Sequence, residues 1–309
     1  TTTTTTLPGG PTTTTTLPGG PTTTTTTLPG GPTTTTLPPA GNDFSGDGNA
    51  EALWNFESGA LTTDSKGTNT LTDNNTVGTD TVNYKEGDAS ASFVNANSEY
   101  LSITNDNLNS GFPLKNGGTG TFSVAFWYKA ESQGAYRGLV TKYDSGLPNS
   151  KTLMIRDDRG TLQFYIGYNF GSKYEILDAS YTGLTTGVWY HIGATFDNTT
   201  REWQLRVWDN NAKTEAYYAN GTATNNISLT DAPFAIGAWF SGGAPVYPID
   251  GLIDEVVVFR DILSPGDMDQ IRQGGYAEVF TPTTTTTLFP PTTTTMPDDF
   301  RDIAMSMAF

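Results

Sequence analysis

The sequence predicts an all-β fold, either a sandwich or a barrel, with one short helix near its C-terminal end. Three observations support this prediction. Short alternations of apolar and polar residues recur between clusters of Gly, Asn and Asp, as expected for many short strands joined by turns. Only the segment after residue 263 carries start and stop signals of a helix. The longest candidate strand, 247–260, is apolar on both faces in its second half, which indicates a central strand of a packed sheet.

Low-complexity tracts flank the predicted globular domain, which spans residues 42–280. Residues 1–41 repeat a unit of four to six Thr followed by a Leu-Pro segment, and a Thr/Pro-rich linker occupies 281–297. With about one Leu per ten residues, the first tract cannot bury a core, so we expect extended or polyproline II backbone there. Such tracts are typical of O-glycosylated stalks outside the cell, and the alternative is a bare flexible linker. The amphipathic tail 298–309 is too short to form a stable helix alone.

Charge and cysteine content exclude several classes of function. The formal net charge is −16, which disfavours binding to phosphate backbones and suits divalent cations better. The chain has no cysteine, so disulfides, thiol catalysis and cysteine-ligated zinc are excluded. No apolar run approaches the length that spans a bilayer. We therefore expect neither nucleic acid as a partner nor a membrane-spanning segment.

The candidate strands of the domain follow one another at short intervals. The alternation is clearest in 161–167, where Leu162, Phe164 and Ile166 share one face. In chain order the candidates are 52–56, 84–93, 99–103, 121–129, 138–143, 151–156, 161–167, 187–197, 203–209 and 234–237.

The strand within 247–260 carries two carboxylates near its start. Simple alternation places Ile253, Glu255, Val257 and Phe259 on one face and Leu252, Asp254, Val256 and Val258 on the other. A buried strand gives no reason for a carboxylate at position 254. A charged side chain there is costly unless it is paired or bound to a metal, so Asp254 is the least explained residue of the strand.

The predicted helix follows this strand. Ser264 can cap its N-terminus, Pro265 suits its first position, and Asp267 is favoured near its positive end. Gly274 and Gly275 are expected to end it.

Seven of these segments, in this order, resemble the laminin-G-like, concanavalin A-like jelly roll of bacterial surface proteins. The matching segments are 54–57, 64–67, 87–93, 122–127, 189–197, 251–256 and 263–265. The resemblance implies two curved antiparallel sheets packed face to face. It also implies a binding or adhesion module, often with one structural Ca²⁺.

A calcium site follows from this resemblance. The positions that match the family's calcium ligands are Asp64, in the early Asp-Ser-x-Gly turn, and Asp254 on the late strand. Calcium takes six to eight oxygen ligands from carboxylates and loop carbonyls, and the carbonyl of Gly67 is a candidate. The alternative is that Asp64 only stabilises its turn and Asp254 only accepts backbone hydrogen bonds.

We expect no catalytic residue. Some enzymes of this fold use paired carboxylates, but Asp254 and Glu255 are adjacent and should point to opposite faces. His191 is the only histidine, and it is expected to be structural beside Trp189 because the sequence marks no partners for a Ser-His-Asp triad.

Aromatic residues are the candidate ligand contacts, since sugar rings stack on exposed aromatic faces. Trp239 and Tyr247 flank a Gly-rich loop, and Tyr168 lies in an aromatic strand-loop region with Tyr165 and Tyr174. The alternative is that these rings belong to the core, as most aromatic residues in sandwiches do.

Together these observations predict a non-enzymatic module, outside the cell or on its surface, that binds a glycan or a surface protein. The competing hypothesis is a structural subunit of an extracellular filament or coat whose Thr-rich tracts pack between copies of the chain.

Overall fold

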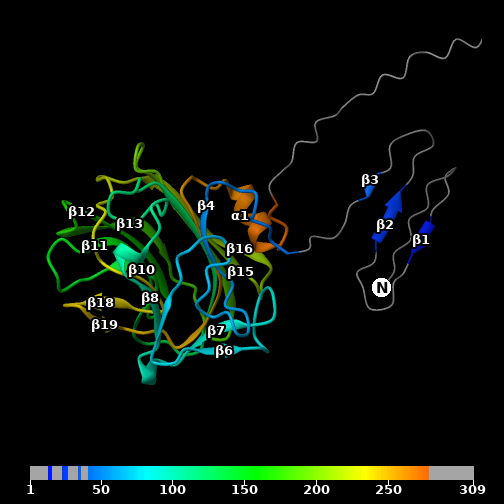
Figure 1. The fold of residues 1–309 in the computed structure, drawn as a ribbon, viewed down its shortest axis with the longest axis horizontal. Helices are drawn as coiled ribbons and strands as arrows, with labels where there is room; N and C mark the ends of the chain where they lie inside the picture. Colours follow the sequence, from blue (N-terminus) through cyan, green and yellow to red (C-terminus); the bar gives the residue numbers. More distant parts are fainter. Residues whose placement is uncertain (1–12, 16–22, 27–33, 36–40, 278–309) are drawn as a thin grey trace, which may run out of the picture. The chain divides into compact units, whose positions relative to one another are not determined.

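The computed structural model describes residues 13–15, 23–26, 34–35 and 41–277 (Figure 1). The predicted linker 281–297 and tail 298–309 lie outside the described residues. Three Thr segments of the N-terminal tract, β1 (Thr13–Thr15), β2 (Thr23–Thr26) and β3 (Thr34–Thr35), pair as an antiparallel sheet in the order β1-β2-β3. Their backbone is extended, as expected, but successive Thr segments run in opposite directions.

Two large antiparallel sheets form the domain, which confirms the predicted two-sheet sandwich (Figure 1). The seven-stranded sheet contains, in spatial order, β13 (Lys173–Tyr181), β12 (Thr161–Tyr168), β11 (Lys151–Asp158), β10 (Tyr136–Tyr143), β17 (Phe234–Ile236), β8 (Tyr100–Ile103) and β5 (Thr72–Asn74). Two short 3₁₀ helices flank β8, at Asn95–Asn97 and Asn105–Asn107.

The eight-stranded sheet contains the strands on the other side of the core. In spatial order these are β16 (Thr214–Thr222), β15 (Glu202–Asp209), β14 (Trp189–Phe196), β9 (Phe122–Ala130), β20 (Gly251–Phe259), β7 (Ser90–Phe93) and β6 (Gly78–Asp80). The remaining strand, β4 (Ala50–Trp54), pairs with β20. A separate hairpin, β18 (Trp239–Ser241) and β19 (Ala244–Val246), lies beside β10 (Figure 1).

The main core lies between the two sheets and is rich in aromatic side chains. Phe126 and Tyr128 of β9 are fully buried there, together with Phe164 of β12 and Phe234 of β17. The Trp54 ring stacks on Phe234 with ring centroids 5.4 Å apart, so β4 and β17 meet across the core. Each such buried side chain contributes about 1.5–3 kcal/mol relative to an exposed one.

The central strand β20 departs from the simple alternation that its sequence suggests. Asp254 pairs with Trp127, but Val257 pairs with Ala125, so β20 carries one extra residue in a bulge. Glu255, inside the bulge, has a positive φ of 53°. As a result Ile253 shares the main core with Val256 and Val258, while Val257 and Phe259 lie in a second cluster. The expected grouping of Ile253 with Val257 was therefore wrong, because a bulge reverses alternation beyond it.

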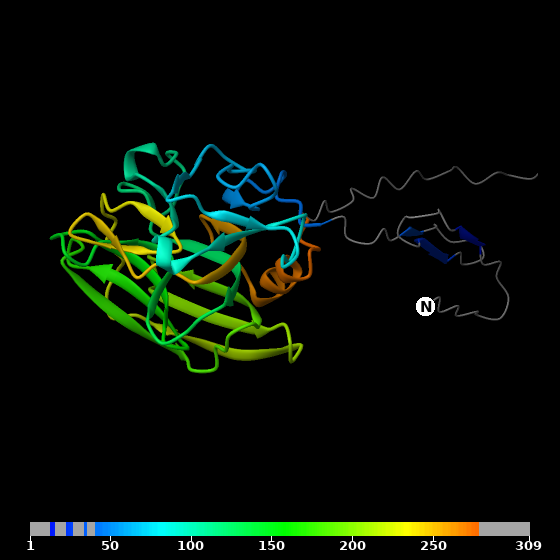
Figure 2. The ribbon, with the colours of Figure 1, turned by 90° about the horizontal axis from the view of Figure 1, so that it is seen from below.

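The helix α1 (Pro265–Arg272) has the predicted N-terminus. The Ser264 side chain accepts a hydrogen bond from the Asp267 amide, and the Asp267 carboxylate accepts one from Ser264. Met268 and Ile271 pack with Val257 and Phe259, so α1 covers the outer face of the eight-stranded sheet (Figure 2). Neither α1 nor the 3₁₀ helices in the described part of the chain has the length and apolar character needed to cross a bilayer.

Candidate functional site

An open groove lies on the outer face of the seven-stranded sheet. Because Leu153, Ile155 and Phe164 face the main core, their neighbours Met154, Arg156 and Tyr165 face outward. The groove has a volume of about 390 Å³, which is within the usual range for small-ligand sites. We call it the aromatic groove; it is lined by Tyr136, Tyr143, Ser145, Met154, Arg156, Tyr165, Tyr174, Trp239 and Tyr247.

The β18–β19 hairpin forms one wall of the aromatic groove. Asp144, which follows β10, accepts hydrogen bonds from the amides of Gly242 and Gly243 at 2.7 Å each, and so fixes the hairpin turn. The rings of Trp239 and Tyr247 stack with centroids 4.6 Å apart. Trp239 is only 4% exposed, whereas Tyr247 is 44% exposed. Tyr247 therefore presents a ring to a ligand, and Trp239 supports it from beneath.

Arg156 occupies the middle of the aromatic groove. Its guanidinium carbon lies 4.7 Å from the centroid of the Tyr165 ring and 4.9 Å from that of Tyr136. Its Nε and Nη2 atoms both donate hydrogen bonds to Oε1 of Gln163, at 3.0 and 2.9 Å. Gln163 is its register partner on β12. These contacts hold the guanidinium in one orientation while it remains beside the open volume.

Tyr143 and Tyr165 offer neutral hydroxyl groups to the groove. Burial raises the pKa of Tyr143 and of Tyr165 above the usual value. Tyr165 donates a hydrogen bond to Gln163 at 2.8 Å. Tyrosine side chains of this kind offer an apolar ring and a polar hydroxyl to the same ligand.

The structure brings two of the three predicted ligand contacts together. Trp239 and Tyr247 both line the aromatic groove, and Tyr168, at the end of β12, is not among its lining residues. Sequence reasoning missed Tyr136, Tyr143 and Arg156. The sequence alone shows that the outward positions of β10 and β11 carry large side chains, which could have marked them as candidates. Only the strand order shows that these side chains lie next to the β18–β19 hairpin.

Asp64 makes the contacts expected of a turn-stabilising residue. Its Oδ1 accepts hydrogen bonds from the amides of Leu53, Lys66 and Gly67 at 2.8–3.0 Å. Its Oδ2 accepts bonds from the backbone and side-chain amides of Asn69, both at 2.9 Å. With five N–H donors around it, this carboxylate does not fit a calcium ion, which is itself coordinated by oxygen lone pairs.

Asp254 has a different environment. Its Oδ2 accepts hydrogen bonds from the amides of Lys85 and Glu86 at 2.7 and 3.4 Å, and its buried Oδ1 has no partner among the described residues. Burial raises the pKa of Asp254 to about 8. No described hydrogen bond joins Asp254 to Asp64, and the described residues contain no cluster of three or more acidic or histidine side chains suited to a metal.

The bulge also changes the expected relation between Asp254 and Glu255. Burial and then repulsion from Asp254 raise the pKa of Glu255 well above its usual value, so the two carboxyl groups interact. Ile253 and Val256 both face the main core with Asp254 and Glu255 between them, so simple alternation does not determine the faces that the two carboxyl groups take. Both side chains are nevertheless buried, at 0% and 4% exposure, and neither lines the aromatic groove.

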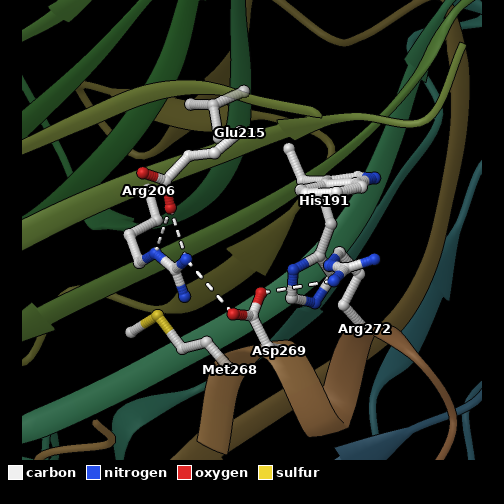
Figure 3. Close-up of a pocket in the computed structure, with 8 residues that line it drawn as sticks. His191, Arg206, Glu215, Met268, Asp269 and Arg272 are labelled. Carbon is white, nitrogen blue, oxygen red and sulfur yellow. Dashed lines mark hydrogen bonds and ion pairs between the residues drawn. The ribbon is translucent and has the colours of Figure 1, made fainter. Parts of the chain in front are cut away.

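His191 lies in a small hollow between β14, β15 and α1 (Figure 3). Its ring packs edge-on against Trp127, with centroids 5.0 Å apart. Burial, and then the positive charges of Arg272 and Arg206, lower the pKa of His191 to about 3. The hollow has a volume of about 10 Å³, enough for about one water molecule. His191 thus contributes to packing as a neutral ring.

A larger hollow of about 510 Å³ lies near the C-terminal end of α1. Among its described lining residues Trp127 is the one aromatic residue, and the Lys85 ammonium already lies 4.2 Å from the centroid of its ring. This hollow therefore offers a ligand no free aromatic face, and the aromatic groove is the better candidate site.

A family model and one of the similar solved structures support the fold. A family model described as the concanavalin A-like lectin/glucanases superfamily matches residues 95–268. The binding domain of botulinum neurotoxin serotype D is similar at a TM-score of 0.50 and 14% identity, over 73% of this chain and 52% of that one. The CBM40 of Ruminococcus gnavus IT-sialidase, bound to α2,3 sialyllactose, matches at a TM-score of 0.40 and 17% identity, over 51% and 83%. No curated protein matches the chain.

Proposed function

The chain belongs to the concanavalin A-like lectin/glucanase superfamily, and on that premise we propose that it is a non-enzymatic module that binds glycans in the aromatic groove. The observation that carries the proposal is one groove lined by both the exposed Tyr247 ring and the fixed guanidinium of Arg156. Aromatic faces take up the apolar side of a sugar ring, and the hydroxyl and guanidinium groups bond to its oxygens.

A binding role suits the groove better than catalysis does. Its described lining residues include no Asp, Glu or His. Glycoside hydrolysis generally needs two carboxyl groups on either side of the scissile bond. The buried pair Asp254 and Glu255 is closed off from this groove and cannot supply them.

Adhesion outside the cell is the setting that we propose for this binding. Its support is the Thr/Pro-rich composition on both sides of the domain, which suits O-glycosylated stalks. A domain carried on such stalks would present the aromatic groove to ligands away from its attachment point.

A glycan array probed with the full chain tests the proposal. We expect binding to at least one glycan class, and loss of at least tenfold in affinity for Tyr247→Ala. Tyr218→Ala is the matched control, because Tyr218 is also 44% exposed but lies on the edge strand β16. Equal loss in both variants, or no binding to any glycan, would contradict the assignment.

The alternative proposal is a repeating subunit of an extracellular filament or coat. The observation that favours it is the antiparallel pairing of the Thr segments β1, β2 and β3, since the same pairing could form between copies of the chain. Electron microscopy of the full chain at high concentration tests it. Regularly spaced domains would support the filament, and dispersed single particles would contradict it.

Calcium remains a separate proposal, at Asp254 alone. Its support is the buried, unpartnered Oδ1 of this residue. The test is the melting temperature of the chain in EDTA and after addition of Ca²⁺. A rise with Ca²⁺ that Asp254→Asn removes would support a site there, and no shift in either direction would contradict it.

A further inference from the structure

We propose that the aromatic groove selects acidic glycans and that Arg156 binds a sugar carboxylate. This inference rests on the proposed function and adds the chemical class of the ligand. It starts from the contrast between the whole chain, with a formal net charge of −16, and the groove, where Arg156 is the one charged residue among the described lining residues.

Positive charge is concentrated at the groove. The Lys151 ammonium lies 5.9 Å from the centroid of the Tyr143 ring, and the Arg159 guanidinium lies 5.0 Å from that of Tyr136. Among the described residues, Asp158 is the one carboxylate that forms ion pairs with the two arginines, at 2.8 Å from Nε of Arg159 and 3.6 Å from Nη2 of Arg156. With Asp144 at the hairpin turn counted as the second anion, the described residues leave a positive balance of one beside the groove.

Part of the Arg156 guanidinium makes no hydrogen bond to the described residues. A guanidinium has five N–H donors in a planar fork, and the described contacts use one at Nε and one at Nη2, both to Gln163. Its Nη1 group makes no hydrogen bond to a described residue and is not among the buried unpartnered atoms. The Asp158 carboxylate, at 3.6 Å, is beyond hydrogen-bond distance. The Nη1 and Nη2 edge can therefore bond to both oxygens of a carboxylate.

The neighbouring rings make this donor specific for a sugar acid. Tyr136 and Tyr165 lie on the guanidinium, and Tyr247 stands on the hairpin wall within 5.5 Å of the Tyr136 ring centroid. A ligand with a pyranose ring and a carboxylate on the same residue can stack on a ring and pair with Arg156 together. Gln163 and the rings hold the guanidinium in place, so little side-chain entropy is lost on binding.

The test compares each acidic glycan with its uncharged methyl ester. The probes are polygalacturonate, alginate, hyaluronan and sialyllactose, each as the free acid and as the carboxyl methyl ester, titrated into the full chain by calorimetry. We expect at least one acid to bind about 10- to 100-fold more tightly than its ester. Added salt should narrow this difference, because the interaction is between charges near solvent.

Matched variants assign the preference to Arg156. Arg156→Gln should remove the difference between acid and ester, and Arg156→Lys should keep part of it, because a point charge replaces the fork. Arg260→Gln is the control, because Arg260 contacts Glu51 and Asn49 instead. Melting temperatures of all variants verify that they fold.

The outcomes separate this inference from the function on which it rests. Equal binding of every acid and its ester, or an undiminished difference in Arg156→Gln, would overturn the preference for acids. Binding of only neutral glycans, lost in Tyr247→Ala, would also overturn it and leave the glycan-binding function standing. Absence of binding to every probe and to a neutral glycan array would overturn both.

Discussion

Replacing Asp254 by Asn should change how the stability of the domain depends on pH. Asp254 is fully buried, and burial raises the pKa of its carboxyl group from 3.8 to about 8. The folded state therefore keeps a proton that the unfolded chain releases above about pH 4. Since the folded state binds more protons in this range, the free energy of unfolding falls as pH rises from about 4 to about 8.

The size of the effect follows from the same shift in pKa. One proton held by the folded state alone changes the free energy of unfolding by about 1.4 kcal/mol per pH unit. From pH 5 to pH 7 the wild-type chain should lose about 2.7 kcal/mol through Asp254. The Asp254→Asn variant has no carboxyl group at this position. Its free energy of unfolding should therefore not fall with pH through this residue.

Urea denaturation, followed by tryptophan fluorescence in EDTA from pH 5 to pH 8, measures the two slopes. The control is Asp106→Asn, because Asp106 is exposed. We expect the free energy of unfolding of Asp106→Asn to change with pH as that of the wild type does. Between pH 5 and pH 7, the free energy of unfolding of Asp254→Asn should rise by about 2.7 kcal/mol relative to that of the wild type. Parallel slopes for Asp254→Asn and the wild type would refute the reasoning, because Asp254 would then be ionised in the folded state.

Three further substitutions test the fold. Ser264→Ala removes the helix cap and should cost about 1 kcal/mol in the free energy of unfolding; an unchanged urea midpoint would argue against the cap. Gly251→Ala places a Cβ 2.2 Å from the carbonyl oxygen of Lys129 and should lower the free energy of unfolding by about 3 kcal/mol. A melting temperature equal to that of the wild type would show that β20 and β9 are not so close. Burial lowers the pKa of Lys142 from 10.5 to about 7, so the unfolded chain binds more protons than the folded state between these values. The free energy of unfolding of the wild type should therefore rise by about 1.4 kcal/mol per pH unit from pH 7.5 to pH 9.5 through this group, and Lys142→Met should lack this rise. Parallel slopes of the two chains in urea denaturation would contradict the buried ammonium group.

Much of the fold follows from local patterns in the sequence. Alternation in 161–167 identifies β12 and its inward face, and the signals at Ser264 and Pro265 identify the start of α1. The edge strands β13 and β16 were missed. β16 has no buried residue in any position, so its sequence lacks the apolar alternation that marks a half-buried strand.

The departures from prediction come from long-range geometry. The bulge at Glu255 depends on how β20 pairs with β9, and no local pattern in 251–259 announces an extra residue. The role of Asp64 was left between two alternatives because the same turn sequence suits a calcium ligand and an acceptor of backbone N–H groups. In the structure Asp64 accepts hydrogen bonds from the amides of Leu53 and Asn69, which lie far from this turn's own Asp-Ser-x-Gly pattern or just beyond it.

The aromatic groove was predictable only in part for the same reason. Trp239 and Tyr247 are close in sequence and stand out beside a Gly-rich loop. Tyr136 and Arg156 join them only because β10 and β11 are neighbours and the hairpin lies beside β10. Strand order is a property of the whole fold, so local reasoning could not bring these residues together.

The most direct test of the proposed glycan site is the indole N–H signal of Trp239 in a ¹⁵N NMR titration. The full chain has six tryptophans, and only Trp239 lines the aromatic groove. With a glycan identified on the array, we expect the Trp239 signal to shift in proportion to saturation while those of Trp127 and Trp208 stay in place. A shift of Trp127 or Trp208 with Trp239 unchanged would place the ligand elsewhere and contradict the proposal.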